Sequence, residues 1–383
     1  MLDPIHPFPA RMAPELAFDF LAELPKDSLI LDPMCGSGVA LRSAVEAGHR
    51  PIGIDADPLA VLMSKVWVEN NRHTRLPNYA DDLVERATKY RELTVPWHSG
   101  EDETTEFVQF WFGLRQRRDL ARLALAIRRT ADNTPPYITR AFQLALSRLI
   151  VTKTKGASLA WDVAHSRPHK KKDENDFDVM EEFRRACAVL ARKLTNNKPD
   201  WTAAVKKGDA RRMRLADKSV DAVITSPPYL NAIDYMRGHR LSLVWLGYGL
   251  AELRSVRSKS IGTETARKYK RRAYLGDHSA NANPKMQRMI EQYLRDIGQL
   301  AREIKRVSRP KAKICIITAN SNIKGYEVRT NTLIHAAAEG AGLSFVGEKI
   351  RSIEANRRYL PVSTKNNALT SRMMEEHIQY YVA

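Results

Sequence analysis

Cysteines, metal-binding patterns and membrane-spanning runs are scarce or absent in this chain of 383 residues. Its three cysteines, Cys35, Cys187 and Cys315, are far apart and form neither a disulfide framework nor a Cys-x-x-Cys zinc pair. The ten histidines lack metal-ligand spacing, so we expect no metal site. No run of eighteen apolar residues suggests a membrane span, and the first residues lack the basic and apolar regions of a signal peptide. We therefore expect a cytoplasmic protein with no membrane partner.

Acidic residues are in deficit. The chain contains 44 Asp and Glu residues and 62 Lys and Arg residues, which gives a net charge of +18. Such an excess indicates a polyanionic partner, and nucleic acid is the leading candidate, although simple solubility is an alternative reason for the charge. The apolar fraction of 43% supports a buried core, and the length allows two domains or one domain with a large insertion.

A glycine loop between two apolar runs indicates a cofactor site near the N-terminus. The run 28–32 ends in Asp32, and the loop Pro33-Met34-Cys35-Gly36-Ser37-Gly38 leads into a predicted helix over 39–47. A second strand, 51–54, ends at Asp55, so the unit predicts a parallel βαβ arrangement of Rossmann type. Leu41 occupies the position of the third glycine of the dinucleotide fingerprint, which disfavours NAD. The pattern suits S-adenosylmethionine, because the glycines admit the methionine moiety and Asp55 can accept both ribose hydroxyls.

A second motif, Ser226-Pro227-Pro228-Tyr229, follows the predicted strand 221–224. Two prolines fix φ and remove two backbone donors, which leaves carbonyl acceptors between a hydroxyl and an aromatic ring. Taken alone, the motif is equally typical of an ordinary turn at the end of a strand. In an open α/β sheet, however, ligands gather at the carboxyl ends of the strands. We therefore expect this motif to lie beside the glycine loop and to hold a planar group that bears an amino group.

The remaining regions predict helices and a basic loop. Three apolar stripes with helical spacing indicate packing faces in a helical insertion over 62–200. The stripes are Phe107, Trp111 and Leu114; Leu120, Leu123 and Ile127; and Phe177, Met180, Phe183, Cys187, Leu190 and Leu194. Residues at about 251–286 have poor apolar periodicity and many basic side chains, which is typical of a loop that contacts DNA. The residues that we expect to contact phosphates there are Arg267, Lys268, Lys270, Arg271 and Arg272.

The glycine loop and the Ser-Pro-Pro-Tyr motif together resemble the DNA amino-methyltransferases, which methylate cytosine at N4 or adenine at N6. The resemblance covers residues 1–61 and 201–383, and it places the helical insertion 62–200 between two parts of one catalytic domain. It implies a Rossmann-like methyltransferase fold with a mostly parallel seven-stranded sheet. The stretch from His6 to Arg11 resembles the N-terminal cofactor arm of the family, and the order of the motifs is one of its circular permutations.

The same resemblance implies the roles of individual residues. Asp55 would bind the ribose, and Asp209, which is equally acceptable as a helix N-cap, would bind the adenine amino group. The cofactor residues so implied are His6, Pro7, Phe8, Ala10, Asp32, Pro33, Cys35, Gly36, Gly38, Asp55 and Asp209. The catalytic residues are Ser226, Pro227, Pro228 and Tyr229. Ser226 and the Pro227 carbonyl would accept hydrogen bonds from the target amino group, and Tyr229 would stack on the flipped base.

Serine in the first motif position is the more frequent choice for cytosine N4 in that family. The resemblance therefore implies a site-specific cytosine-N4 methyltransferase of duplex DNA, in a restriction–modification system with a separately encoded endonuclease, at the nucleoid of a prokaryote. Three alternatives remain open: adenine-N6 methylation of DNA, guanine-N2 methylation of tRNA, and DNA binding without catalysis. Cytosine-C5 methylation is disfavoured, because no Pro-Cys dipeptide supplies its nucleophile.

Overall fold

The computed structural model describes residues 2–8, 11–69, 73–91, 94–98, 102–152, 155–161, 168–170, 173–194, 203–230, 234–263, 284–323, 326–353 and 375–383. The chain forms two compact units. The helical unit comprises Met1–Pro9, Asp57–Thr202 and Asp234–Val256. The sheet unit comprises Ala10–Ala56, Ala203–Ile233 and Arg257–Ala383.

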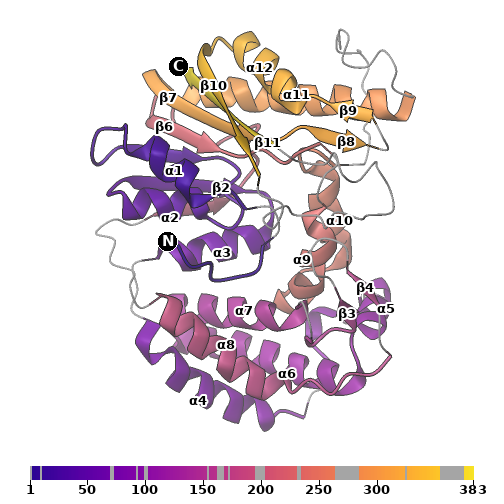
Figure 1. The fold of residues 1–383 in the computed structure, drawn as a ribbon. Coiled ribbons are helices and arrows are strands. Elements are labelled where there is room, and N and C mark those ends of the chain that lie inside the picture. The colour runs from indigo at the N-terminus through magenta and orange to yellow at the C-terminus, as the bar shows by residue number, and fades with distance from the viewer. Residues whose placement is uncertain are drawn as a thin grey trace. The chain divides into compact units, whose positions relative to one another are not determined.

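A seven-stranded sheet forms the centre of the sheet unit (Figure 1). Its strands are β1 (Leu29–Asp32), β2 (Arg50–Asp55), β5 (Ala204–Lys207), β6 (Val220–Thr225), β7 (Ser308–Thr318), β10 (Ser344–Ser352) and β11 (Glu375–Val382). Their order is β10-β11-β7-β6-β1-β2-β5. Only β11 is antiparallel to its neighbours, and the other pairs are parallel. This is the predicted Rossmann-like methyltransferase fold with its mostly parallel sheet.

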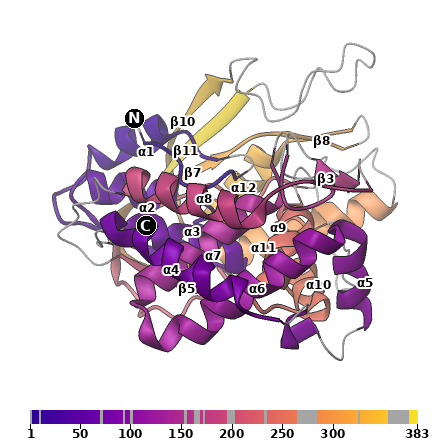
Figure 2. The same ribbon diagram turned by 90° about the horizontal axis from the view of Figure 1, so that it is seen from below.

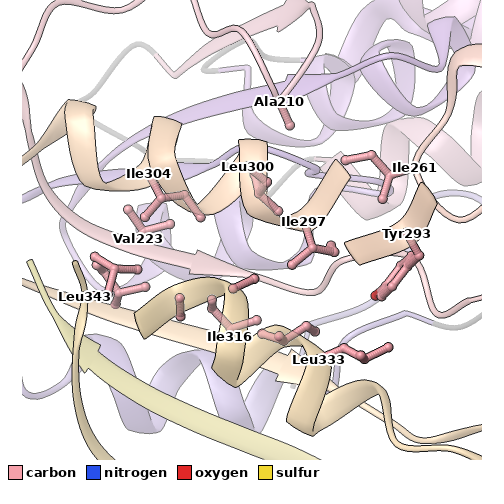
Figure 3. Packing of buried hydrophobic residues seen from close by; sticks show 14 of the residues in the cluster. Ala210, Val223, Ile261, Tyr293, Ile297, Leu300, Ile304, Ile316, Leu333 and Leu343 are labelled. Atoms are coloured by element: carbon pink, nitrogen blue, oxygen red, sulfur yellow. The ribbon is translucent and has the colours of Figure 1, made fainter. Parts of the chain in front are cut away.

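Helices cover both faces of this sheet. On one face, α1 (Pro14–Leu21) and α2 (Val39–Glu46) pack against Ile30, Ala222 and Ile317. On the other lie α11 (Pro284–Val307) and α12 (Thr330–Gly340). Figure 3 shows the apolar side of α11 against the strand residues Val223 and Ile316. Each fully buried aliphatic side chain stabilises the fold by about 1.5–3 kcal/mol, so the buried apolar face of α11 is what holds this helix to the sheet.

The helical unit consists mainly of helices α3 to α9, several of which lie side by side in Figure 2. They are α3 (Pro58–Val68), α4 (Leu76–Thr88), α5 (Asp102–Trp111), α6 (Leu114–Thr130), α7 (Pro136–Ile150), α8 (Val179–Leu194) and α9 (Tyr235–Leu243). Helix α10 (Leu250–Lys259) begins in this unit and ends in the sheet unit. No helix in the described ranges is long and apolar enough to cross a membrane.

Short elements complete the two units. The two-stranded pairs are β3 (Ala160–Trp161) with β4 (His169–Lys170), and β8 (Ser321–Ile323) with β9 (Tyr326–Val328). The 3-10 helices are η1 (His73–Arg75), η2 (Pro96–His98), η3 (Ala131–Asn133) and η4 (Val244–Leu246).

Two sequence predictions need correction. The stripe through Phe107 and Trp111 does not continue to Leu114, because α5 ends at Trp111 and Leu114 begins α6 with 74% of its surface exposed. The predicted basic loop is also shorter than expected. Its first residues form α10, where Leu250 and Leu253 are buried one turn apart, and α11 begins at Pro284. A single buried pair is enough to dock a short helix whose overall periodicity is weak.

Candidate active site

The cofactor loop turns sharply after β1 and attaches to the end of β2. Gly36 and Gly38 have φ of 50° and 89°, a region that glycine enters without steric cost. The Cys35 N–H donates to the Ile54 carbonyl at 3.0 Å, and the Gly36 N–H donates to the Asp55 carboxylate at 2.8 Å. The predicted cofactor residues Cys35, Gly36 and Asp55 are thus together at the carboxyl edge of the sheet.

Close packing accommodates the leucine at the position of the third fingerprint glycine. A Cβ atom on Gly53 would lie 2.4 Å from Leu41 Cδ1 and 3.2 Å from Cys35 Sγ. The glycine of β2 therefore makes room for the leucine that replaces the third fingerprint glycine. Gly53 is absent from the predicted set, although a glycine inside a buried strand is a sign of such a close approach.

Asp32, the last residue of β1, is buried and joins the two predicted motifs. Its Oδ1 accepts hydrogen bonds from Thr225 Oγ1 at 2.8 Å and from the Met34 N–H at 3.1 Å. Burial raises the pKa of Asp32 to about 7, against the lowering effect of the Thr225 hydroxyl. Thr225, which is missing from the predicted set, ends β6 immediately before Ser226. Because β1 and β6 are parallel neighbours, both motifs leave the sheet at the same edge.

Asp209 lies two residues beyond β5 and belongs to a charged cluster. Arg211 holds it in a two-pronged contact, Nε to Oδ1 at 2.9 Å and Nη2 to Oδ2 at 2.8 Å. The same guanidinium donates through Nη1 to Asp296 of α11 at 2.6 Å. The Gly208 N–H donates to the Asp55 carbonyl at 2.9 Å, which fixes the loop after β5 beside the end of β2. The two acids assigned to ribose and adenine are therefore neighbours, whereas Arg211 and Asp296 are absent from the predicted set.

The Ser-Pro-Pro-Tyr motif continues from β6 as a loop without regular secondary structure. Burial raises the pKa of Tyr229, nearby Glu376 adds to the shift, and a hydrogen bond with the Ser226 hydroxyl opposes it. The next residue, Leu230, is anchored in the same hydrophobic core as Ile261 and Tyr293. The backbone around Gly262 packs on the motif as well: a Cβ atom there would lie 3.4 Å from the Tyr229 carbonyl oxygen.

The predicted N-terminal arm belongs to the helical unit up to Pro9, and the sheet unit begins at Ala10. The His6 ring hydrogen-bonds through Nε2 to Ser147 Oγ at 3.0 Å, and the Phe8 ring stacks on Tyr235 at 5.1 Å between centroids. The place of His6, Pro7 and Phe8 beside the cofactor loop stays a prediction.

Other predicted residues lie outside the described part of the chain. These are Ala10 of the arm and the basic residues Arg267, Lys268, Lys270, Arg271 and Arg272. Within the described ranges, no group of three or more His, Cys, Asp or Glu side chains is arranged to hold a metal ion.

Comparison with known proteins agrees with the paired motifs. No family model matches the chain. It is 23% identical over 367 residues to type II methyltransferase M.MvaI of Kocuria varians, covering 86% of this chain and 79% of that one. It is 22% identical to M.MjaII of Methanocaldococcus jannaschii, covering 61% of this chain and 60% of that one. For M.BsoBI of Geobacillus stearothermophilus the identity is 22%, over 64% of this chain and 52% of the relative.

Among solved structures, a SAM-dependent methyltransferase from Methanosarcina mazei is 8% identical with a TM-score of 0.36, over 97% of this chain and 98% of that one. The sequence relatives identify the chain as a relative of the type II methyltransferases. They support the predicted family and, with it, S-adenosylmethionine as the cofactor.

Proposed function

We propose that this protein transfers a methyl group from S-adenosylmethionine to the exocyclic N4 amino group of cytosine in duplex DNA. The observation that carries the proposal is the hydrogen bond between Thr225 and the buried Asp32. It joins a loop suited to a sulfonium cofactor to a loop suited to an amino group, at one edge of the sheet.

The cofactor residues fit their proposed partners chemically. The bound cofactor supplies an electrophilic methyl group. Asp32 offers a buried carboxylate to the cationic methionine end, and the Gly36–Gly38 turn allows the close approach of that end. Asp55 and Asp209, whose loops are tied together through Gly208, would hold the ribose and the adenine amino group.

The hydrogen bond between Ser226 and Tyr229 leaves the serine oxygen available to accept a hydrogen bond from the target base. When the Ser226 proton points to the Tyr229 hydroxyl, the lone pairs of the serine oxygen remain for an amino hydrogen of the base. The Pro227 carbonyl would accept the second amino hydrogen. These two acceptors draw the nitrogen towards tetrahedral geometry and free its lone pair from conjugation with the ring. The freed lone pair would be in line with the methyl group that the cofactor supplies. S-adenosylhomocysteine would be the leaving group as the carbon–sulfur bond breaks, and the amino group would lose one proton to solvent, so no charged base is required.

Reaching N4 requires the cytosine to leave the DNA helix, which costs a few kcal/mol, as in other enzymes that act on a base. The aromatic ring of Tyr229 would compensate by stacking on the flipped base. We assign contacts with the DNA backbone to the basic residues 267–272 and to the helical insertion. The type II names of the relatives support a site-specific enzyme of a restriction–modification system. A separately encoded endonuclease and a cytoplasmic location are further parts of this proposal.

Adenine N6 is the second candidate, because its amino group requires the same two acceptors and only the serine preference of the family favours N4. Transfer to guanine N2 of tRNA is the third, but the relatives' type II names favour DNA.

Nucleoside mass spectrometry separates these candidates. Unmethylated genomic DNA, incubated with the protein and S-adenosylmethionine, is expected to contain N4-methylcytosine. If N6-methyladenine were the only modified base detected, the target would be adenine and not cytosine. Methyl transfer to tRNA but not to duplex DNA would overturn the proposal. Sequencing that detects modified bases would then give the recognition sequence.

A further inference from the structure

Arg211 is a buried arginine whose contacts join three separate parts of the sheet unit. Its side chain is only 9% exposed, and its partners are the carboxylates of Asp209 and Asp296 and the backbone carbonyl of Lys259. The contact with Lys259 runs from Nη2 to the carbonyl oxygen at 2.7 Å. Burial by itself would lower the pKa of Arg211, but the hydrogen bonds that it donates to Asp209 and Asp296 outweigh this and raise it. The guanidinium is therefore permanently charged.

The geometry of a guanidinium makes these contacts interdependent. Its donors form a rigid planar fork, so a rotation that breaks one contact disturbs the others. The Asp296 side chain is 3% exposed, and a buried carboxylate that loses its cation is strongly destabilised. Asp296 thus holds Nη1 of the guanidinium, while Asp209 accepts from Nε and Nη2 and the Lys259 carbonyl accepts from Nη2.

The residues after Lys259 support the catalytic loop. We call residues 259–263 the brace. Ile261 is buried in the core cluster that also contains Leu230. Gly262 has φ of +77°, and a Cβ atom there would lie 3.4 Å and 3.5 Å from the carbonyl oxygens of Tyr229 and Pro228. The brace therefore lies close to the peptide groups that present Tyr229, with room for little more than a methyl group between them.

We propose that Arg211 is a positioning residue that couples the occupancy of Asp209 to the brace behind the catalytic loop. The inference rests on the proposed function, in which Asp209 binds the adenine amino group of the cofactor. A ligand that fixes the Asp209 carboxylate also fixes the guanidinium that holds Lys259, so the cofactor orders the support of Tyr229. Because such coupling is reciprocal, an ordered brace also strengthens cofactor binding.

A second arginine in the sheet unit provides a matched control. Arg306, near the end of α11, contacts Glu303, Asp217 and the backbone carbonyls of Met213 and Leu215. It has the same chemistry as Arg211 and also connects α11 to the segment between β5 and β6. None of its partners belongs to the brace or to the proposed cofactor site.

Hydrogen–deuterium exchange with and without S-adenosylhomocysteine tests the coupling independently of activity. In the unaltered protein, the ligand is expected to slow exchange at residues 208–212 and also at the brace. In Arg211→Lys, which keeps the charge but loses the fork, protection should persist at 208–212 and fall by about tenfold at the brace. Asp296→Asn, which keeps the shape but removes the charge, should act in the same direction, and Arg306→Lys should behave like the unaltered protein.

Equal protection of the brace in Arg211→Lys, or equal loss in Arg306→Lys, would overturn the inference. Absence of protection at 208–212 in the unaltered protein would refute the cofactor site itself, and the inference with it.

Discussion

The carboxyl edge and the amino edge of the central sheet differ in how deeply their polar side chains are buried. At the carboxyl edge, Asp32 and Thr225 are buried against each other, and Arg211 is enclosed by two carboxylates. At the amino edge, where the strands begin, some ion pairs are exposed. Lys313 with Glu23 is an example, with 46% and 66% of the side chains accessible. Exposed pairs contribute about 0–1 kcal/mol, whereas a buried charge without a partner is costly. The buried pair of Asp32 and Thr225 and the enclosed guanidinium of Arg211 thus both lie at the edge where we place the chemistry.

The largest expected effect is a difference in turnover between alanine variants of two serines at opposite ends of β6. Ser226→Ala should lower turnover by about 100-fold, a typical cost of removing one group that contacts the reacting atoms, and leave cofactor affinity nearly unchanged. Ser219, which precedes β6 and donates to the Ala216 carbonyl, is the control, and Ser219→Ala should keep full activity. Single-turnover methylation and calorimetry with S-adenosylhomocysteine measure the two quantities. Parallel losses of turnover and affinity in Ser226→Ala would contradict the assignment.

The next effect concerns the buried carboxyl group of Asp32. Its pKa is raised to about 7, so the carboxylate that would bind the positively charged amino group at the methionine end of the cofactor, a group that S-adenosylhomocysteine retains, forms only as the pH rises through that value. The affinity for S-adenosylhomocysteine should therefore increase by up to about tenfold per pH unit below pH 7. Asp32→Asn should abolish this dependence, and Asp221→Asn, which alters the amino edge, should preserve it. A dependence that survives in Asp32→Asn would show that another group titrates.

Asp32 also predicts how stability depends on pH. Because its pKa is raised by folding, the folded state binds the proton more tightly than the unfolded state does. Its contribution to stability is fully present below about pH 4 and is lost as the pH rises through about 7. Urea denaturation at pH 5 and pH 8 should show a larger difference for the unaltered protein than for Asp32→Asn. An equal difference in both proteins would indicate that Asp32 is ionised throughout.

A smaller effect distinguishes two buried tyrosines. The hydroxyl of Tyr293, which shares a core cluster with Leu230, has no hydrogen-bond partner among the described residues, whereas that of Tyr381 donates to Gln379 at 3.0 Å. Tyr293→Phe should leave the free energy of unfolding unchanged or raise it by about 1 kcal/mol, and Tyr381→Phe should lower it by a similar amount. Urea denaturation measures both. Destabilisation by Tyr293→Phe would indicate that its hydroxyl is hydrogen-bonded after all.

The smallest expected effect lies at the amino edge. Lys313→Ala removes the exposed ion pair with Glu23 and should change the free energy of unfolding by less than about 1 kcal/mol. Methylation should be unaffected. A loss of activity in Lys313→Ala would show that the amino edge of the sheet also contributes to the reaction.

The sequence predicted the sheet well because its strands are recognisable locally. The runs that end in Asp32 and Asp55 are short, apolar and bounded by turn residues, and both form the expected strands. Helix α10 was missed because its apolar periodicity is weak, and its docking depends on the buried pair Leu250 and Leu253. The length of β7 was also not apparent, since Arg309, Lys311 and Lys313 in its first half are charged and exposed.

For the candidate site, the sequence by itself determined the two loops, because glycines and prolines restrict the backbone wherever they occur. It also determined which acids follow the strands. Only the tertiary structure decided the environment of those acids: the burial of Asp32 beside Thr225, and the enclosure of Arg211 by Asp209 and an aspartate 85 residues away. Burial and charge pairing depend on which segments meet in space, and local sequence patterns do not specify those meetings.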